Sequence, residues 1–287
     1  MKAPTERFGT VVLTGGTSGI GKATAHRLAA ISETLIVLGP EAEAGVQQAL
    51  TQVRRSGPAE VHYVRADFAH LSEVVEAARS IRSLVSTIDL LINNAGVPGA
   101  PRRIVTTAGY ERTLQVNALA PALLTRLLVP SLAEGARIVN VGSSAHHRER
   151  FHFDDIDLKH GYSPVAAYAR AKLAMVTWSS LLAEELQSTQ VSVVALCPGL
   201  NDTPLSAAMA GRIGGPPTQG AARVLYAAVA EVPSGSYLEN DRVVSPSADA
   251  TDPSNRKRLA ALYWERLLPF ALAGHGRRAS TAQSQAS

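Results

Sequence analysis

The chain has 287 residues, 46% of them hydrophobic and 18% charged, which excludes a disordered or fibrous protein and fits one large domain or two small ones. Its formal net charge of +4 is spread without a basic run that contains aromatic residues, which argues against a nucleic-acid partner, and one cysteine, Cys197, excludes an internal disulfide and a cysteine-based zinc site. The start, MKAPTERFG, lacks a signal-peptide core and no later run is long enough to cross a bilayer, so we expect a cytoplasmic protein without a membrane span.

Short apolar runs alternate along the chain with longer stretches in which apolar residues recur at helical spacing. This alternation predicts an α/β fold with a single doubly wound (Rossmann-type) parallel sheet and helices on both faces. The strand-like runs are Thr10–Thr14, Thr34–Gly39, Glu60–Ala66, Ile88–Asn94, Ala136–Gly142 and Val191–Cys197. Stretches with helical spacing include Leu71–Val85, Tyr110–Leu132 and Pro164–Gln187.

Composition also sets the expected domain limits. Nothing interrupts the alternation before about Gly274, so we expect one domain of residues 1–274. The last residues, 275–287, read HGRRASTAQSQAS and are small and polar, with nothing to bury. They are therefore predicted to form a disordered polar tail.

The first predicted strand runs directly into a glycine-rich segment, TGGTSGIGKATAHRLA. Gly15, Gly19 and Gly21 stand where the strand turns into a helix. Such a turn lets backbone amides approach a diphosphate, which the helix N-terminus also attracts. A plain tight connection between strand and helix would have the same composition. The position, the first turn of a doubly wound sheet, favours dinucleotide binding.

Two further motifs occur in order after this turn: NNAG at Asn93–Gly96 and YARAK at Tyr168–Lys172. With the spacing of the glycines, they make the chain resemble the short-chain dehydrogenase/reductase family from about Phe8 to Pro269. Three longer segments are similar to the retinol-dehydrogenase-like branch of that family: Arg137–His147, Ala167–Ala174 and Ser234–Ala250.

The YARAK motif places a phenol and an ammonium on one helical face. Tyr168 and Lys172 are separated by one turn, and a cation close to a phenol favours the phenolate. An amphipathic helix with a half-buried tyrosine and a solvated lysine is the plain alternative. The resemblance implies that Tyr168 exchanges a proton with the substrate oxygen, while a nicotinamide exchanges a hydride with its carbon. It also implies that Lys172 binds the nicotinamide ribose.

Two more catalytic residues follow from the resemblance. Ser143 and Ser144 both stand at the end of the fifth strand, and the family pattern selects Ser143 to hydrogen-bond the substrate oxygen. Asn117 matches the helix asparagine that supports a water-mediated proton relay to the lysine. A helix kink or a capping amide is the alternative for Asn117.

The resemblance also implies a set of cofactor contacts. Asp67 matches an aspartate that accepts a hydrogen bond from the adenine amino group, although it could simply cap the next helix. Thr203 belongs to a turn whose threonine reaches the nicotinamide carboxamide or the diphosphate. The full set is Gly15, Thr17, Ser18, Gly19, Ile20, Gly21, Asp67, Phe68, Asn94, Ala95, Gly96, Tyr168, Lys172, Pro198, Gly199, Leu200 and Thr203.

The choice of dinucleotide depends on the end of the second strand. Family members that prefer NAD carry an acid there, and members that prefer NADP carry an arginine there or in the glycine loop. Here Gly39 and Pro40 occupy these places, and the loop offers Thr17 and Ser18. Without an acid nothing repels a 2′-phosphate, and two hydroxyls could donate to it, so we expect NADP rather than NAD.

The segments expected to surround the substrate, residues 97–109, 145–165 and 200–219, are rich in Ala, Gly and Pro. Mobile, apolar walls of this kind suit a bulky hydrophobic small molecule. Within them, His146, His147 and His152 with Asp154 and Asp155 could be taken for a metal cluster. Because neither a helical His pair with i, i+4 spacing nor a thiol is present, we expect a solvated loop and no metal.

The expected function is reduction of a ketone to a secondary alcohol, in secondary metabolism or elsewhere, with NADP. A catalytically silent dinucleotide sensor is one alternative, and a non-redox enzyme on the same fold, performing a cyclisation or an elimination, is another. Apolar faces on Tyr110–Leu132 and Pro164–Gln187 resemble the helices through which family members dimerise. They suggest a homodimer or homotetramer, or are ordinary core-facing stripes.

Overall fold

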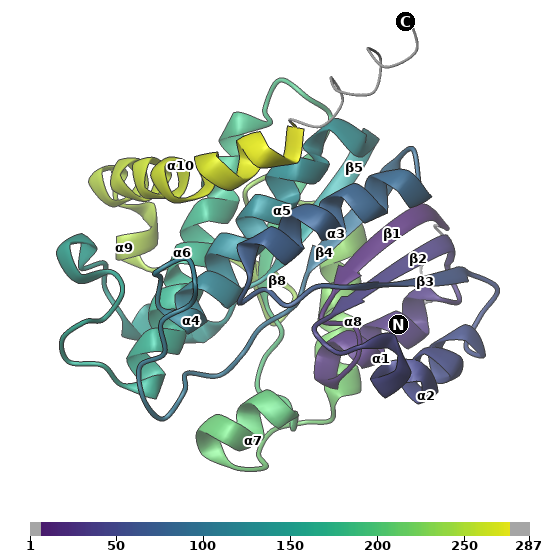
Figure 1. The fold of residues 1–287 in the computed structure, drawn as a ribbon, viewed down its shortest axis with the longest axis horizontal. Coiled ribbons are helices and arrows are strands. Elements are labelled where there is room, and N and C mark those ends of the chain that lie inside the picture. The colour runs from purple at the N-terminus through teal and green to yellow at the C-terminus, as the bar shows by residue number, and fades with distance from the viewer. Residues whose placement is uncertain (1–6, 276–287) are drawn as a thin grey trace, which may run out of the picture.

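Residues 7–275 are described in the computed structural model, and they form one sheet with helices on both faces (Figure 1). The sheet has the strand order β3-β2-β1-β4-β5-β6-β7-β8 and is parallel except for the β7–β8 pair. The predicted doubly wound α/β fold is confirmed. The strands are β1 Phe8–Thr14, β2 Ser32–Gly39, β3 Glu60–Arg65, β4 Ile88–Asn93, β5 Leu132–Val141, β6 Ser192–Cys197, β7 Tyr237–Glu239 and β8 Arg242–Val244.

The six predicted strands are β1 to β6, with ends that differ by a few residues. Their central residues are apolar and buried, as in Val11–Leu13 of β1, because helices cover the sheet from both sides. The strand order reverses beside β1: β2 and β3 extend to one side, and β4, β5 and β6 to the other. At such a switch point the connections leave in opposite directions and open a crevice at the carboxyl ends of the strands.

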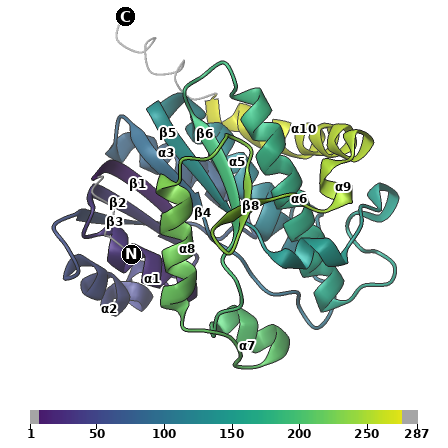
Figure 2. The same cartoon turned by 180° about the vertical axis from the view of Figure 1, so that it is seen from behind.

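Two layers of helices enclose the sheet, and each packs on its own apolar core. One layer, nearer the viewer in Figure 2, consists of α1 Gly19–Leu28, α2 Glu43–Arg54 and α8 Pro217–Val229. The opposite layer consists of α3 Leu71–Leu84, α5 Ala120–Leu128, α6 Pro164–Glu185 and α10 Pro253–His275. Short helices lie in the connections: α4 Arg112–Leu114, α7 Pro204–Ala210 and α9 Ala248–Thr251.

The stretch Tyr110–Leu132, predicted as a helix, is helical from Arg112 to Ser131 but is not one regular α-helix. The segment contains α4, a π-helical turn at Gln115–Leu119 and α5, and it ends in a 3-10 turn before β5 begins at Leu132. Pro121 supplies the reason for the π-helical turn, because it has no N–H to donate to the carbonyl of Asn117 four residues earlier. The interruption therefore falls on a predicted catalytic residue.

Helix α10 lies across α3, α5 and α6 (Figure 1). Leu259, Tyr263 and Leu267 of α10 are buried in the same apolar core as α5 and α6. Because α10 ends at His275, the first residue of the expected tail is helical, and residues 276–287 lie outside the described residues. Among residues 7–275, none of the helices combines the length and apolarity needed to cross a membrane.

Candidate active site

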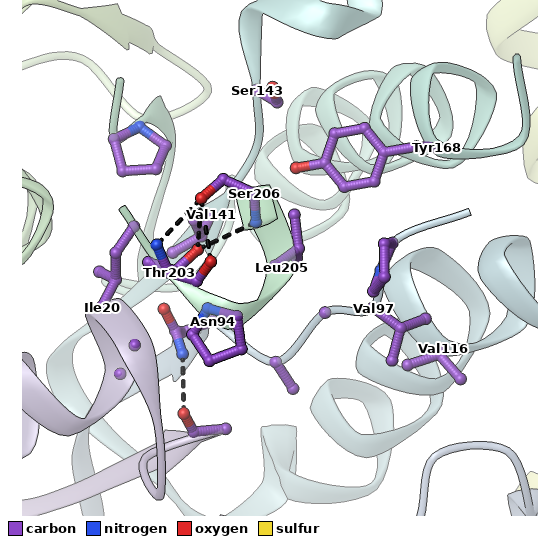
Figure 3. A pocket seen from close by; sticks show the side chains of 18 of the residues that line it. Ile20, Asn94, Val97, Val116, Val141, Ser143, Tyr168, Thr203, Leu205 and Ser206 are labelled. Atoms are coloured by element: carbon purple, nitrogen blue, oxygen red, sulfur yellow. Dashed lines mark hydrogen bonds between the residues drawn. The ribbon is translucent and has the colours of Figure 1, made fainter. Parts of the chain in front are cut away.

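A cleft of about 850 Å³ runs along the carboxyl ends of the strands at the switch point. Its lining contains every predicted site residue except Asn117, so residues from the whole length of the domain come together there. Figure 3 shows Tyr168 on one side of this pocket, Ser143 above it, and Asn94 and Thr203 on the other side. The lining of the cleft includes both Asp67, which follows β3, and Tyr168 of α6.

The glycine-rich turn is shaped by close approaches of the backbone. Gly15 has φ +66°, and a side chain there would lie 2.7 Å from the Cα of Ala95. A Cβ on Gly21 would lie 1.9 Å from the carbonyl oxygen of Gly15. The sequence therefore needs glycine at both positions, and the turn leaves backbone amides open to the cleft, as a diphosphate requires.

Thr14, which the sequence prediction missed, connects this turn to the NNAG motif. Its hydroxyl oxygen accepts hydrogen bonds from the backbone N–H groups of Asn94 (3.0 Å) and Ala95 (2.9 Å). The Asn94 amide in turn donates to the carbonyl oxygens of Thr14 (3.0 Å) and Gly15 (3.2 Å). The signal for these hydrogen bonds is a threonine at the end of β1, because β1 and β4, which carries the NNAG motif at its end, are neighbours in the sheet.

Tyr168 projects from α6 with its hydroxyl pointing into the pocket (Figure 3). Burial raises the pKa of Tyr168 to about 12, and a hydrogen bond with the Ser143 side chain lowers it only in part. The expectation that Lys172 makes this phenol easy to ionise is therefore not met, because burial disfavours the charged phenolate. The phenol is protonated at neutral pH.

Lys172 lies one turn beyond Tyr168 and is buried. Its Nζ donates to the carbonyl oxygen of Val141 at 2.7 Å and lies 5.7 Å from the centre of the Tyr168 ring. Burial lowers the pKa of Lys172 to about 8, which still leaves most of the amine charged at pH 7. The two groups face each other across a short gap, as the sequence spacing predicted.

Ser143 follows the end of β5 and caps the 3-10 helix Ser144–Arg148. Its Oγ accepts a hydrogen bond from the N–H of Ala145 at 3.2 Å, so the hydroxyl proton remains available for donation. The neighbouring Ser144 N–H points instead to the sulfur of Cys197, at 3.3 Å. Cys197 is buried, lines the cleft and supports the loop that carries Ser143.

Asn117 is fully buried behind the cleft, in the π-helical turn. Its side-chain oxygen accepts from the N–H of Val97 at 2.8 Å, and its amide donates to the carbonyl oxygen of the same residue at 2.9 Å. The side chain therefore fixes the chain after β4, which passes beside Lys172 at Gly96. The relay role stays a prediction.

The far wall of the cleft is formed around α7. Thr203 and Ser206 form a reciprocal capping box at the start of this helix, so the Thr203 hydroxyl is engaged by the Ser206 N–H at 3.2 Å (Figure 3). Asn201, not predicted, donates to the carbonyl oxygens of Pro198 (3.0 Å) and Gly199 (2.9 Å) and holds the turn before the helix. Leu200 is 58% exposed at the rim.

Two acids line the opposite end of the cleft. Asp67 uses one carboxylate oxygen to accept from the N–H of Ala69 at 2.9 Å, whereas the N-cap position of α3 is His70, whose side chain makes no capping hydrogen bond. Glu41, which follows β2 by two residues, has its carboxylate 3.2 Å from the hydroxyl of Thr17. Its backbone is fixed by Tyr63, whose hydroxyl donates to the Glu41 carbonyl oxygen at 2.7 Å. A carboxylate therefore stands beside the glycine loop, which the residues at positions 39 and 40 did not suggest.

Among residues 7–275, His152, Asp154 and Asp155 do not belong to any group of three ligand atoms close enough to hold a metal ion. The structure instead groups His146 and His147 with Glu239 of β7, and their ligand atoms lie within 4.8 Å of one another. Both ring nitrogens of His146 already have hydrogen-bond partners, the carbonyl oxygen of Ser143 and the N–H of Ser247. This arrangement fits a hydrogen-bonded histidine better than a metal ligand.

Similarity to known proteins covers most of the chain. A model described as short chain dehydrogenase matches residues 9–212. The polyprenol dehydrogenase of Mus musculus is 34% identical over 288 residues, which cover 92% of this chain and 84% of that protein. Retinol dehydrogenase 13 of Mus musculus is 34% identical over 292 residues, with coverages of 93% and 85%. A crystal structure of an uncharacterised protein from Mycobacterium paratuberculosis has a TM-score of 0.78 at 30% identity and covers 93% of this chain and 97% of that one.

Proposed function

This chain belongs to the short-chain dehydrogenase family and is an NAD(P)-dependent oxidoreductase, and on that basis we propose that it reduces a ketone on a bulky, largely apolar small molecule to a secondary alcohol. The observation that carries the proposal is the position of the Tyr168 hydroxyl, beside Ser143 and opposite Lys172, in a cleft that also contains the glycine-rich turn. A dinucleotide bound on that turn would supply the hydride.

The protonation states support the reducing direction. Because burial keeps the pKa of Tyr168 near 12, its phenol holds a proton at neutral pH and can donate it to a carbonyl oxygen. The Ser143 hydroxyl, whose oxygen accepts from the N–H of Ala145, can donate its proton to the same oxygen when a substrate is bound. As Tyr168 loses its proton, the ammonium of Lys172, 5.7 Å from the ring centre, stabilises the negative charge that remains.

The walls around these groups favour a bulky substrate. Val97, Val116, Leu205 and Met209 line the catalytic end of the cleft with apolar surface. The relatives are named for retinol and polyprenol, which are both large apolar alcohols. A ketone of comparable size and apolarity would fill this surface, and its carbonyl oxygen would face Tyr168.

Two cations interrupt the apolar walls. The side chains of Arg112 and Arg148 line the cleft, and neither forms an ion pair among residues 7–275. The acids of the lining, Glu41 and Asp67, belong to the β2–β3 end. A substrate with an oxygen-rich or acidic group would match this charge, so carboxylated ketones belong in a substrate screen beside neutral ones.

The carboxylate of Glu41 bears on the choice of dinucleotide. The residues at positions 39 and 40 favour NADP, but Glu41 places negative charge 3.2 Å from Thr17, one of the hydroxyls expected to donate to a 2′-phosphate. A carboxylate there would repel that phosphate and could accept hydrogen bonds from the ribose hydroxyls of NAD. We therefore favour NAD as the tighter-binding cofactor.

The proposal is tested by following absorbance of the reduced nicotinamide with a panel of aromatic and aliphatic ketones. Replacing Tyr168 by Phe should lower kcat by at least about 100-fold, because the proton donor is lost, while dinucleotide binding stays within a few-fold. Tyr226→Phe, a change on α8 away from the cleft, is the matched control. Equal turnover by wild type and Tyr168→Phe would overturn the proposal.

The same assay separates the alternatives. Saturable dinucleotide binding without turnover of any ketone or alcohol would favour a sensor. Substrate conversion without net oxidation or reduction of the cofactor would favour a cyclisation or elimination on this fold. The presence of Ser143, Tyr168, Lys172 and Asn117 together favours the redox enzyme over both.

A further inference from the structure

His146 is a fully buried histidine three residues after Ser143, outside the set of residues that the reaction uses directly. Its Nδ1 lies 2.7 Å from the carbonyl oxygen of Ser143, and its Nε2 lies 3.1 Å from the backbone nitrogen of Ser247. The backbone N–H of His146 also donates to the Ser143 carbonyl oxygen, at 3.1 Å. The carbonyl group of the predicted catalytic serine is therefore held twice by one residue.

These partners determine the tautomer of the ring. A carbonyl oxygen can only accept, so Nδ1 must carry a hydrogen; a backbone N–H can only donate, so Nε2 must offer its lone pair. Both bonds exist together only in the neutral imidazole with the proton on Nδ1. A protonated ring would lose the bond to Ser247 and would bring two N–H groups together.

The second partner ties this ring to the helix that carries Tyr168. Ser247 directly precedes α9, and α9 packs against α6. The ring of His146 also meets the ring of Tyr237 of β7 edge to face, with centroids 5.0 Å apart. His146 thus bridges the Ser143 loop, β7 and the segment beside α6.

We propose that His146 is a positioning residue, which acts through Ser143 by fixing the carbonyl group of that residue and hence the direction of its hydroxyl toward Tyr168. The inference rests on the proposed redox function. Ser143 Oγ is held on its other side by the N–H of Ala145, so rotation of the Ser143–Ser144 peptide would move the hydroxyl away from the substrate oxygen. Displacements of about 1 Å in such groups can cost on the order of 100-fold in rate.

The surroundings keep the ring neutral. The titratable groups that face it are His147 from its own segment and Tyr237 and Glu239 from β7. Burial is the largest influence and lowers the pKa of His146, and His147 lowers it further; the Ser143 carbonyl and Glu239 act in the opposite direction without reversing the result. The neutral tautomer required by the two hydrogen bonds is the form present at neutral pH.

Three replacements separate the two bonds. His146→Asn can place an amide N–H near the Nδ1 position and keep the bond to Ser143; His146→Gln reaches the Nε2 position instead and keeps the partner for Ser247. His146→Phe keeps an aromatic ring at this position and loses both hydrogen bonds. His152→Asn, at an exposed histidine six residues further along the chain, is the matched control. Each variant is also made in a Ser143→Ala background, and kcat, KM, dinucleotide Kd and the melting temperature are measured.

We expect His146→Phe and His146→Gln to lower kcat by about 10- to 100-fold with dinucleotide Kd within about twofold, and His146→Asn to stay within about threefold of wild type. In the Ser143→Ala background, His146→Phe should add less than about threefold, since the effect passes through Ser143. Equal losses in both backgrounds, or unchanged kcat in His146→Phe, would overturn the inference. An inactive wild type would instead count against the proposed function.

Discussion

At the scale of single residues, the buried charge of Lys172 is expected to lower the stability of the fold while it supports the reaction. Its amine is buried, and its pKa falls from the ordinary 10.5 to about 8 because the charged form is desolvated. Below pH 8 the buried amine of Lys172 is charged in the folded chain, and burying that charge lowers the free energy of unfolding. Between pH 8 and 10.5 the amine of Lys172 binds more protons in the unfolded chain than in the folded one, so its contribution to stability should rise with pH across that window.

Replacing Lys172 by Met should expose this opposition. Loss of the buried charge is expected to stabilise the fold by about 2 kcal/mol at pH 7, and the gain should vanish above pH 10.5, where the lysine is neutral in both states. Activity should fall at least about 100-fold, because the cation beside Tyr168 is gone. Urea unfolding at pH 7 and pH 10.5 measures the first effect, and ketone reduction the second. A destabilised variant at pH 7 would contradict this account.

Glu41 is the residue at which the preference for NAD over NADP should be decided. Removing its charge in Glu41→Gln should tighten NADP binding by about tenfold relative to NAD, because repulsion of the 2′-phosphate disappears while the side chain keeps its size. Glu43→Gln, an exposed acid two residues further on at the start of α2, should leave the ratio unchanged. Fluorescence titration of both dinucleotides gives the Kd values. An unaltered ratio in Glu41→Gln would show that another group selects the cofactor.

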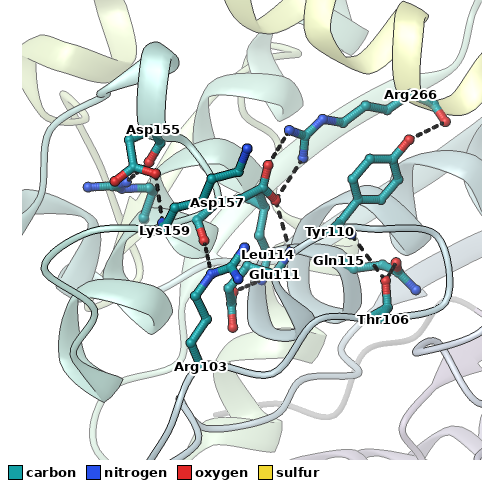
Figure 4. Close-up of polar contacts among 11 residues, drawn as sticks. Arg103, Thr106, Tyr110, Glu111, Leu114, Gln115, Asp155, Asp157, Lys159 and Arg266 are labelled. Carbon is teal, nitrogen blue, oxygen red and sulfur yellow. Dashed lines mark hydrogen bonds and ion pairs between the residues drawn. The ribbon is translucent and has the colours of Figure 1, made fainter.

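At the scale of elements, one buried ion pair joins the loops around the substrate end to α10. Asp157 accepts from Arg266 of α10, and its side chain is 10% exposed against 13% for Arg266. The same carboxylate accepts from the N–H of Glu111 at 2.9 Å. The backbone carbonyl oxygen of Asp157 accepts from the Arg103 side chain at 2.7 Å (Figure 4). Two loops distant in sequence, before α4 and before α6, thus meet at Asp157.

Breaking this junction should be costly. Asp157→Asn leaves the Arg266 guanidinium buried without its countercharge, and we expect a loss of about 3 kcal/mol in the free energy of unfolding. Glu184→Gln removes the acid of a pair with Arg256, but Glu184 is 67% exposed, so its loss should be below about 1 kcal/mol. Urea unfolding compares the two variants. Equal losses would mean that burial does not set the strength of the Asp157–Arg266 pair.

The elements show what the sequence could and could not predict. Strands β1 to β6 were visible because short, continuous runs of Val, Ile and Leu between helical stretches are typical of strands buried on both faces. The hairpin of β7 and β8 was missed because its strands have three residues each. Its signal is Asn240–Asp241, both with positive φ, which is the composition of a tight two-residue hairpin turn.

Site residues could be predicted where a local motif fixes the backbone. They were harder to predict where contacts between distant parts of the chain determine their role. The glycine turn and the Tyr168–Lys172 pair follow from local geometry. In contrast, Thr14 and Glu41 acquire their roles from partners across the sheet or the loop, and such pairing is not visible in one sequence. The pKa of Tyr168 was misjudged because the sequence shows the nearby cation but not the extent of burial.

At the scale of the whole molecule, α10 covers part of the helical faces that were expected to form a dimer. Trp178 and Leu182 of α6 are buried together with Leu259, Tyr263 and Leu267 of α10, and the rings of Trp178 and Tyr263 lie 6.3 Å apart. Part of the face of α6 is therefore covered by the chain's own last helix. A homodimer formed through these helices would use the part of their faces that α10 leaves uncovered, or α10 itself.

The anchoring of α10 can be tested with two leucines on the same helix. Leu259 is 0% exposed and Leu272 is 63% exposed, so Leu259→Asp places a carboxylate in the core whereas Leu272→Asp places it in water. We expect Leu259→Asp to lose at least about 3 kcal/mol and, with α10 released, to self-associate through the uncovered faces of α5 and α6. Leu272→Asp should unfold like wild type and keep its mass, as measured by urea unfolding and by light scattering after size exclusion. If Leu259→Asp keeps the wild-type mass and stability, α10 does not cover this face in solution. If only Leu272→Asp lowers the mass, the exposed side of α10 forms the contact between copies.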